Sequence, residues 1–174
     1  MMLRWLKRVF GGGCRSSAER PPAYDFQAPA GWEVINEAGG TLVVCPDVEM
    51  DWTANMHFEM RKDRGDRTLP QMIEDLAGNL PSHKSQFQLL ASGVAELPDG
   101  GACGFVEYVH RDGALVLRDR ETLIPLKPPA VLFVLSSTAD ALAAKYTPIF
   151  EAAINSLQLP GDAAPPKKPA APEA

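Results

Sequence analysis

The most constraining feature of this sequence is the run AVLFVLSS at residues 130–137. In a β-strand, successive side chains point to opposite faces of the sheet. This run is apolar at both sets of alternating positions, and a strand of that kind needs cover on both faces. It therefore predicts a strand at the centre of a sheet, beneath a helix on one face.

The residues that follow this run supply the cover. Apolar residues recur there at helical spacing: Leu142, Ala143, Tyr146, Ile149, Phe150, Ala153, Ile154 and Leu157. Pro148 stands among them, and a proline inside a helix removes one backbone hydrogen bond. We therefore expect two helical pieces, with Thr147 capping the second and Pro148 at its first position.

Three short strands are expected in the first half of the chain. WEVINE and TLVVC have the pattern of a hairpin. The third strand, at 54–60, places Met56, Phe58 and Met60 on one face and His57 on the other, polar face.

A helix is expected next, at TLPQMIEDLAGNLP. Thr68 and Gln71 form a capping-box pattern at its start. Gly78, Asn79 and Pro81 are poor residues for a helix interior, so we expect the helix to end there.

The second half predicts a meander. FQLLASGVAEL, ACGFVEYVHRDG and ALVLRDRETLIPL are strand-like, and turn residues at 111–113 and 127–129 separate them from one another and from AVLFVLSS. The fold class predicted from these segments is α+β, an antiparallel sheet of about six or seven strands packed with two main helices.

Composition divides the chain into three parts: a basic leader and linker at 1–22, a folded domain at 23–159, and a Pro/Ala-rich tail at 160–174 that we expect to be disordered. The leader has five basic residues and one acidic, a charge of 5 − 1 = +4. The domain has ten basic and nineteen acidic, a charge of 10 − 19 = −9. An acidic body repels phosphate, so we expect no nucleic-acid partner.

The leader, MLRWLKRVFGGGC, lacks the uninterrupted apolar stretch that a lipoprotein signal needs before its cysteine. Its spacing instead suits a short amphipathic helix with one cationic side. The apolar arc contains the predicted contact residues Leu3, Trp5, Leu6, Val9 and Phe10. Weak contact with an anionic membrane, docking on a protein partner and a frayed leader all remain open.

No catalytic or metal-binding signature is found in the sequence. The histidines are far apart, with no metal-binding spacing, and nucleophile and phosphate-loop motifs are missing. Cys45 and Cys103 lie in strand-like, apolar stretches and are expected to be buried thiols, although a bridge between them remains open if the protein is exported. The residues therefore indicate a non-enzyme without metal or cofactor.

Four residues are candidates for contact with a client protein: Trp52, His57, Arg118 and Arg120. Trp52 stands in an acidic loop, where an aromatic side chain is either a binding hot spot or a lid over the core edge. In the run 118–121, Arg118 and Arg120 share one strand face and Asp119 and Glu121 the other. We expect a solvated surface there, with the arginines near Glu59 or Glu107.

The order of AYDFQAPAGWEVI, a strand with WTANMHFEM, a TLPQMIEDL helix, a meander and a closing helix ending IFEAAINSLQL resembles the PsbP-like superfamily. That group includes the photosystem extrinsic subunit, the Mog nuclear-import factor and bacterial DcrB-related proteins. The resemblance covers about residues 23–159. It implies an antiparallel sheet packed with helices, used to bind proteins more often than to catalyse. Some bacterial members are chaperones of type VI secretion effectors, which hold the effectors' transmembrane segments on a groove.

The function expected from this reasoning is a non-catalytic protein-binding module, a bacterial cytoplasmic chaperone or adaptor that holds an apolar segment of a client. The client itself is expected to be of the secretion-effector type and to carry transmembrane segments. The alternative is a peripheral membrane or envelope assembly factor anchored by its leader. An enzyme with a pocket around His57, His110 or Cys103 is the third hypothesis.

Overall fold

A computed structural model describes residues 24–37, 39–62 and 65–159. The predicted leader at 1–22 and tail at 160–174 lie outside these residues. The elements in chain order are β1 (Glu33–Glu37), β2 (Gly40–Val44), β3 (Asn55–Arg61), α2 (Leu69–His83), β4 (Ser85–Glu96), β5 (Ala102–Asp112), β6 (Leu115–Pro125), β7 (Val131–Ala139), a 3-10 turn η1 (Asp140–Leu142) and α3 (Ala143–Asn155).

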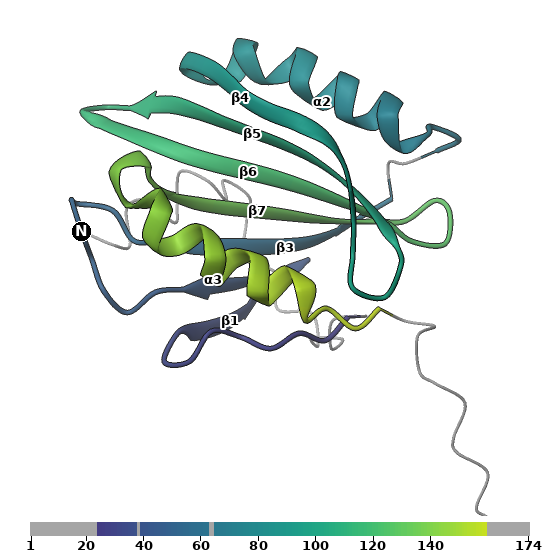
Figure 1. Cartoon of the computed structure of the whole chain (residues 1–174), viewed down its shortest axis with the longest axis horizontal. Helices are drawn as coiled ribbons and strands as arrows, with labels where there is room; N and C mark the ends of the chain where they lie inside the picture. Colours follow the sequence, from purple (N-terminus) through teal and green to yellow (C-terminus); the bar gives the residue numbers. More distant parts are fainter. Residues whose placement is uncertain (1–23, 38, 63–64, 160–174) are drawn as a thin grey trace, which may run out of the picture.

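All seven strands form one antiparallel sheet in the order β1-β2-β3-β7-β6-β5-β4 (Figure 1). The predicted α+β fold, with a meander in its second half and two main helices, is confirmed. β7 is the fourth of the seven strands, and eight of its nine residues are buried. The central position predicted for AVLFVLSS is therefore also confirmed.

The two helices cover opposite faces of this sheet (Figure 1). On one face, Leu132 and Val134 of β7 pack in the same cluster as Phe150 of α3. On the other, Val131 and Phe133 pack with Met72 of α2. We call these surfaces the α3 face and the α2 face. Strand alternation divides β7 between two cores, which explains why it is apolar on both sides.

Helix α3 is continuous through Pro148, so the prediction of two helical pieces is wrong. The turn η1 precedes it, and the helix then runs without a break to Asn155. Tyr146 lies on one side of the proline and Phe150 on the other, and both are buried in the same cluster. Their packing offsets the single hydrogen bond that the proline cannot donate.

Helix α2 begins as predicted and ends later than predicted. Thr68 caps it, and the backbone amide of Thr68 donates to the Gln71 side chain at 2.8 Å, completing the capping box. The helix continues through Gly78, Asn79 and Pro81 to His83, so the predicted end is wrong. Leu80 is buried in a cluster with Val106 and Tyr108, and this contact keeps the last turn on the sheet.

Both described cysteines are free and buried. Cys45 and Cys103 lie in the cluster under α3, which confirms their expected place as small core residues. Burial raises the pKa of the Cys103 thiol, partly offset by the nearby charge of Arg120.

Gly104 of β5 lets α2 approach the sheet closely. A Cβ at this position would lie 2.8 Å from the Ile73 side chain and 2.9 Å from that of Leu69, both on α2. At Gly93, on the neighbouring strand β4, a Cβ would meet only the Phe105 ring, at 3.8 Å. The first glycine is required by packing and the second is not.

We therefore expect Gly104→Val to lower the free energy of unfolding by about 2 kcal/mol, because the added side chain forces α2 off the sheet. Gly93→Ala is the matched control and should leave stability unchanged or slightly raised, since alanine restricts the unfolded chain. Urea unfolding of both variants measures this. Equal losses at the two positions would contradict the close approach of α2 at Gly104.

Candidate functional site

Strand β6 carries the charged run singled out in the sequence, and its register divides the run between the two faces. Arg118 lies opposite Thr138 and Arg120 opposite Ser136 on β7, while Asp119 lies opposite Ser137. Because directly paired residues share a face, the arginines lie on the α3 face and the two acidic residues on the α2 face. The predicted alternation is correct.

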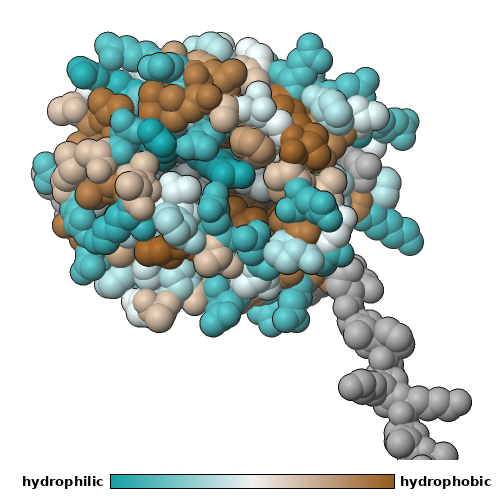
Figure 2. Space-filling model, viewed as in Figure 1, coloured by the Kyte–Doolittle hydropathy of each residue, from teal (hydrophilic) through white to brown (hydrophobic). Residues whose placement is uncertain are grey.

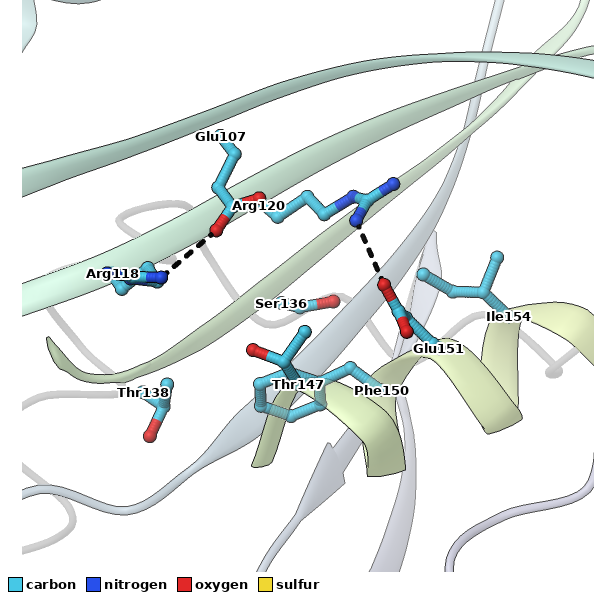
Figure 3. A pocket seen from close by; sticks show the side chains of 9 residues that line it. All are labelled: Glu107, Arg118, Arg120, Ser136, Thr138, Thr147, Phe150, Glu151 and Ile154. Carbon is cyan, nitrogen blue, oxygen red and sulfur yellow. Dashed lines mark hydrogen bonds and ion pairs between the residues drawn. The ribbon is translucent and has the colours of Figure 1, made fainter. Parts of the chain in front are cut away.

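The two arginines line a polar groove between α3 and the sheet (Figure 3). Figure 2 shows hydrophilic residues across the middle of the same side of the molecule. The lining comprises Glu107, Arg118, Arg120, Ser136, Thr138, Thr147, Phe150, Glu151 and Ile154. We call this surface the polar groove.

Each arginine of the polar groove already has a carboxylate partner. Arg118 donates from Nε to Asp140 at 2.8 Å and from Nη1 to Glu107 at 3.5 Å. Arg120 donates from Nη1 to Glu151 of α3 at 3.3 Å. Both partners drawn in Figure 3 are acidic, so the charge of the groove is largely neutralised within the protein. Of the two partners expected from the sequence, Glu107 is correct.

Glu59, the other expected partner, lies elsewhere. It pairs with Arg61 at 2.8 Å on the α2 face. The reason is again strand alternation, which places residue 59 of β3 beside Phe133 of β7 and away from the arginines.

Three polar atoms at the floor of the groove find no hydrogen-bond partner among the described residues: Arg120 Nε, Ser136 Oγ and Thr138 Oγ1. Ser136 and Thr138 are each only 2% exposed. The space beside them is about 20 Å³, which is room for roughly one water molecule. The two arginines tie α3 and η1 to the sheet through Glu151 and Asp140. Whether Arg118 and Arg120 contact a client stays a prediction.

The acidic residues on the α2 face are buried, which corrects the expected solvated surface. Asp119 is 3% exposed and Glu121 is 7% exposed, because the end of α2 and the residue after it close over β5 and β6. Asp119 accepts from Ser137 at 2.7 Å and from Lys84 at 3.1 Å, and lies 2.9 Å from His110 Nε2. We call these four residues the Asp119 network.

The two buried carboxyls have opposite electrostatic environments. Burial alone would raise the pKa of Asp119, but the hydrogen bond with His110 and the charge of Lys84 outweigh it, so the pKa lies below its ordinary value. For Glu121 burial prevails and raises the pKa, although a hydrogen bond from Tyr108 at 2.7 Å partly offsets it. Asp119 is therefore held as a carboxylate and Glu121 is pushed toward its neutral form.

The Asp119 network contains serine, histidine and aspartate but not the geometry of a nucleophile. The hydroxyl of Ser137 bonds the carboxylate of Asp119, and His110 bonds the other oxygen of the same carboxylate. A catalytic serine has to share its proton with the imidazole. The arrangement as described stabilises a buried charge and supplies no base to Ser137.

The other two candidates lie apart from both sites. His57, on β3, faces the α2 side between Leu42 and Leu135, and burial lowers its pKa. Trp52 is half-buried in a turn where it pairs with Glu49. Glu49 in turn contacts Lys145 and Tyr146 of α3. The structure thus does not bring Trp52, His57 and the arginines together.

Sequence reasoning missed a groove between α2 and the edge strand β4. It measures about 600 Å³ and is lined by Pro70, Ile73, Glu74, Ala77, Gly78, Ser92, Gly93 and Val94. Along β4, Leu89, Leu90 and Val94 are 45%, 40% and 53% exposed. In Figure 2, hydrophobic residues are visible on the upper part of the molecule, where Figure 1 places α2 and β4. We call this surface the α2–β4 groove.

A signal for this groove existed in the sequence. Leu89 and Leu90 are adjacent, and neighbours on a strand point to opposite faces, so one core cannot bury both without an irregularity. The structure has a register shift between Leu89 and Ala91, and both leucines remain exposed. An exposed apolar edge strand is a template for pairing with another chain.

The predicted membrane or partner contacts Leu3, Trp5, Leu6, Val9 and Phe10 lie outside the described residues. Within the described part, no three histidine, cysteine, aspartate or glutamate side chains are grouped to hold a metal ion. No described helix is long and apolar enough to cross a bilayer.

The opposite environments of Asp119 and Glu121 predict opposite pH effects on stability. Between the ordinary pKa of Glu121, 4.5, and its raised value in the fold, the folded state holds the extra proton, so stability falls as pH rises. The ionised Asp119 carboxylate stabilises the fold at pH values above its ordinary pKa of 3.8. This stabilisation is lost as the pH falls through the lowered pKa that Asp119 has in the fold.

We expect Glu121→Gln to fold and to have a higher free energy of unfolding than wild type, by an amount that is larger at pH 8 than at pH 5. Asp119→Asn should cost about 3 kcal/mol at neutral pH, because it leaves Lys84 and His110 beside an uncharged group. Urea unfolding at both pH values, followed by tryptophan fluorescence, tests the pair. A Glu121→Gln variant that loses more stability at pH 8 than at pH 5 would refute the assignment.

No protein-family model matches this chain, and no curated protein matches it. Solved structures do. LpqN of Mycobacterium tuberculosis, described as involved in cell envelope biogenesis, aligns with a TM-score of 0.63 and 12% identity over 78% of this chain and 82% of LpqN. PA94 of Pseudomonas aeruginosa, a protein of unknown function, aligns with a TM-score of 0.60 and 16% identity over 78% of this chain and 96% of PA94.

The cyanobacterial PsbP protein CyanoP, from Synechocystis sp. PCC 6803, aligns with a TM-score of 0.58 and 18% identity over 85% of this chain and 98% of CyanoP. At these identities the likeness concerns the fold alone. The seven-stranded antiparallel sheet between two helices is therefore a PsbP-like fold, as the resemblance in the sequence implied.

Proposed function

We propose that this domain is a non-catalytic protein-binding module, a chaperone or adaptor, and that it holds an extended apolar segment of a client along β4. The observation that carries this proposal is the α2–β4 groove beside an exposed apolar edge strand. β4 pairs only with β5 in the described sheet, so its outer edge has free backbone donors and acceptors.

The geometry favours an extended segment. An incoming strand would complete its backbone hydrogen bonds on the β4 edge and place alternate side chains in the α2–β4 groove. Two small residues of the lining, Ala77 and Gly78, leave room for those side chains. The net charge of −9 over residues 23–159 (10 − 19) favours clients whose apolar segments have basic flanks. Transmembrane segments of secretion effectors are one such class, and bacterial cytoplasm is the compartment we propose.

A photo-crosslinking residue placed at Leu90 in the full-length protein tests this proposal in native cells. The matched control is Val116, an equally exposed apolar position on β6 at 42% exposure, against 40% for Leu90. We expect one stoichiometric adduct from position 90, mapped by mass spectrometry to an apolar segment of a single protein, and none from position 116.

Adding Val94→Glu should lower the yield of that adduct at least about tenfold, because a charge buried against the client costs more than 1.4 kcal/mol. The same substitution at Val116 should leave the yield unchanged. Identical adducts from both positions, or none from Leu90, would count against a client on β4.

The cationic amphipathic pattern of residues 2–10 favours a second candidate function, a peripheral membrane or envelope assembly factor. The likeness to LpqN, a protein of cell envelope biogenesis, is compatible with this role. For this candidate, Trp5→Glu combined with Phe10→Glu should abolish co-sedimentation of the full-length chain with vesicles of anionic phospholipid. Sedimentation equal to wild type would exclude the leader as the anchor.

A further inference from the structure

The α2 face of the sheet has an apolar region beyond the reach of α2. Helix α2 packs on β4, β5 and, more lightly, β6, and its Met72 reaches Val131 and Phe133 of β7. Further across the sheet, the register aligns Ile35, Leu42, His57 and Leu135 on β1, β2, β3 and β7. Val44 lies on the same face of β2, two residues after Leu42, in the next row of paired residues across the sheet. We call Ile35, Leu42, Val44 and Leu135 the apolar strip.

Two residues of the apolar strip are buried although they lie outside the clusters under the two helices. Leu42 is 2% exposed and Val44 is 7% exposed. Neither belongs to any of the three hydrophobic clusters that the described residues form. Leu135 marks the border, since it packs against the Met72 cluster under α2. Protein interiors are close-packed, so a buried leucine and valine require partner side chains.

We propose that residues 2–10 of this chain are the cover, packed in cis on the apolar strip through Leu3, Trp5, Leu6, Val9 and Phe10. Apart from position 38 and positions 63–64, only residues 1–23 and 160–174 lie outside the described structure. The tail is made of proline, alanine and charged residues, whereas the segment 2–10 has an apolar arc about half a turn wide. It is the segment with the large side chains that the strip requires.

Charge complementarity supports this occupant. Glu33 lies in the row of Val44, and Glu37 and Glu59 lie in the row on the other side of Leu42. Glu59 is already paired with Arg61, which leaves Glu33 on one side of the strip and Glu37 on the other as acidic partners. Arg4, Lys7 and Arg8 occupy the side of the segment opposite its apolar arc. A helix placed with that arc on Leu42 would hold its cationic side near the rim, where such pairs favour one orientation.

The length of the connection permits the contact. Tyr24 lies on the α3 face, where its hydroxyl donates to Thr41 at 3.1 Å. For residues 2–10 to reach the apolar strip, residues 11–23 have to span from the α3 face to the α2 face. Thirteen residues reach up to about 43 Å when extended, several times the spacing of about 4.8 Å between neighbouring strands.

Paramagnetic relaxation tests this proposal on the full chain. A nitroxide is attached at Arg4→Cys, with Cys14→Ser to remove the native thiol of the leader, in protein labelled at its leucine and valine methyl groups. We expect loss of the Leu42, Val44 and Leu135 methyl signals, while those of Leu90, Val94 and Val116 persist. Signals lost on β4 instead would place the leader in the α2–β4 groove, and no loss would show that it covers neither surface. Both results overturn the proposal.

Two variants and one mixture complete the test. Leu6→Glu with Phe10→Glu should restore the Leu42 and Val44 signals, whereas Arg15→Gln with Arg20→Gln, which changes the net charge by the same −2, should not. If both pairs of substitutions restored the Leu42 and Val44 signals, charge alone would hold the leader, and this would contradict packing on the strip. Broadening that appears only when spin-labelled chains are mixed with isotope-labelled, unmodified chains would assign the cover to a second copy and overturn the cis contact.

Discussion

Burial of β7 on both faces is the constraint on which the rest of this structure depends. A strand with apolar residues on both of its faces needs a hydrophobic layer above and below it. The chain meets this need with α3 on one face and α2 on the other, and the order of strands follows, with β3 and β6 on either side of β7. Close approach of α2 then requires glycine at position 104, and α3 stays continuous through Pro148 because its packing on the sheet spans the proline.

Placing helices on both faces gives the same charged strand two different environments. On β6, Arg118 and Arg120 remain partly accessible under α3 and are neutralised by carboxylates from other elements. Asp119 and Glu121, one residue away in each case, lie under the α2 side and are buried. Despite burial, His110, Lys84 and Ser137 lower the pKa of Asp119, whereas for Glu121 burial outweighs the hydrogen bond from Tyr108 and the charges of Lys84 and Arg61, so its pKa is raised. The charged residues of β6 therefore mainly bind elements of the fold to one another.

The alternation of charged residues on β6 was predictable, because strand geometry fixes which side chains share a face. Their burial was not, since it depends on where α2 ends, and that end is set by the contact of Leu80 with Tyr108 rather than by Gly78 or Pro81. Sequence reasoning named Arg118 and Arg120 and missed the α2–β4 groove, which is made of residues about twenty positions apart in the chain. None of them has chemistry that a motif could identify.

Local pattern alone determined the seven strands, the cap of α2, the apolar stripe of α3 and the central position of β7, because each follows from side-chain periodicity within a few residues. It also determined the acidic character of the domain and the amphipathic character of residues 2–10. The tertiary structure decided which residues those elements bring together: the buried Asp119 network, the polar groove, the exposed edge of β4 and the apolar strip across β1, β2 and β7. These features arise from packing between distant segments, where the free energy of burial outweighs the local preferences of proline, glycine and charge.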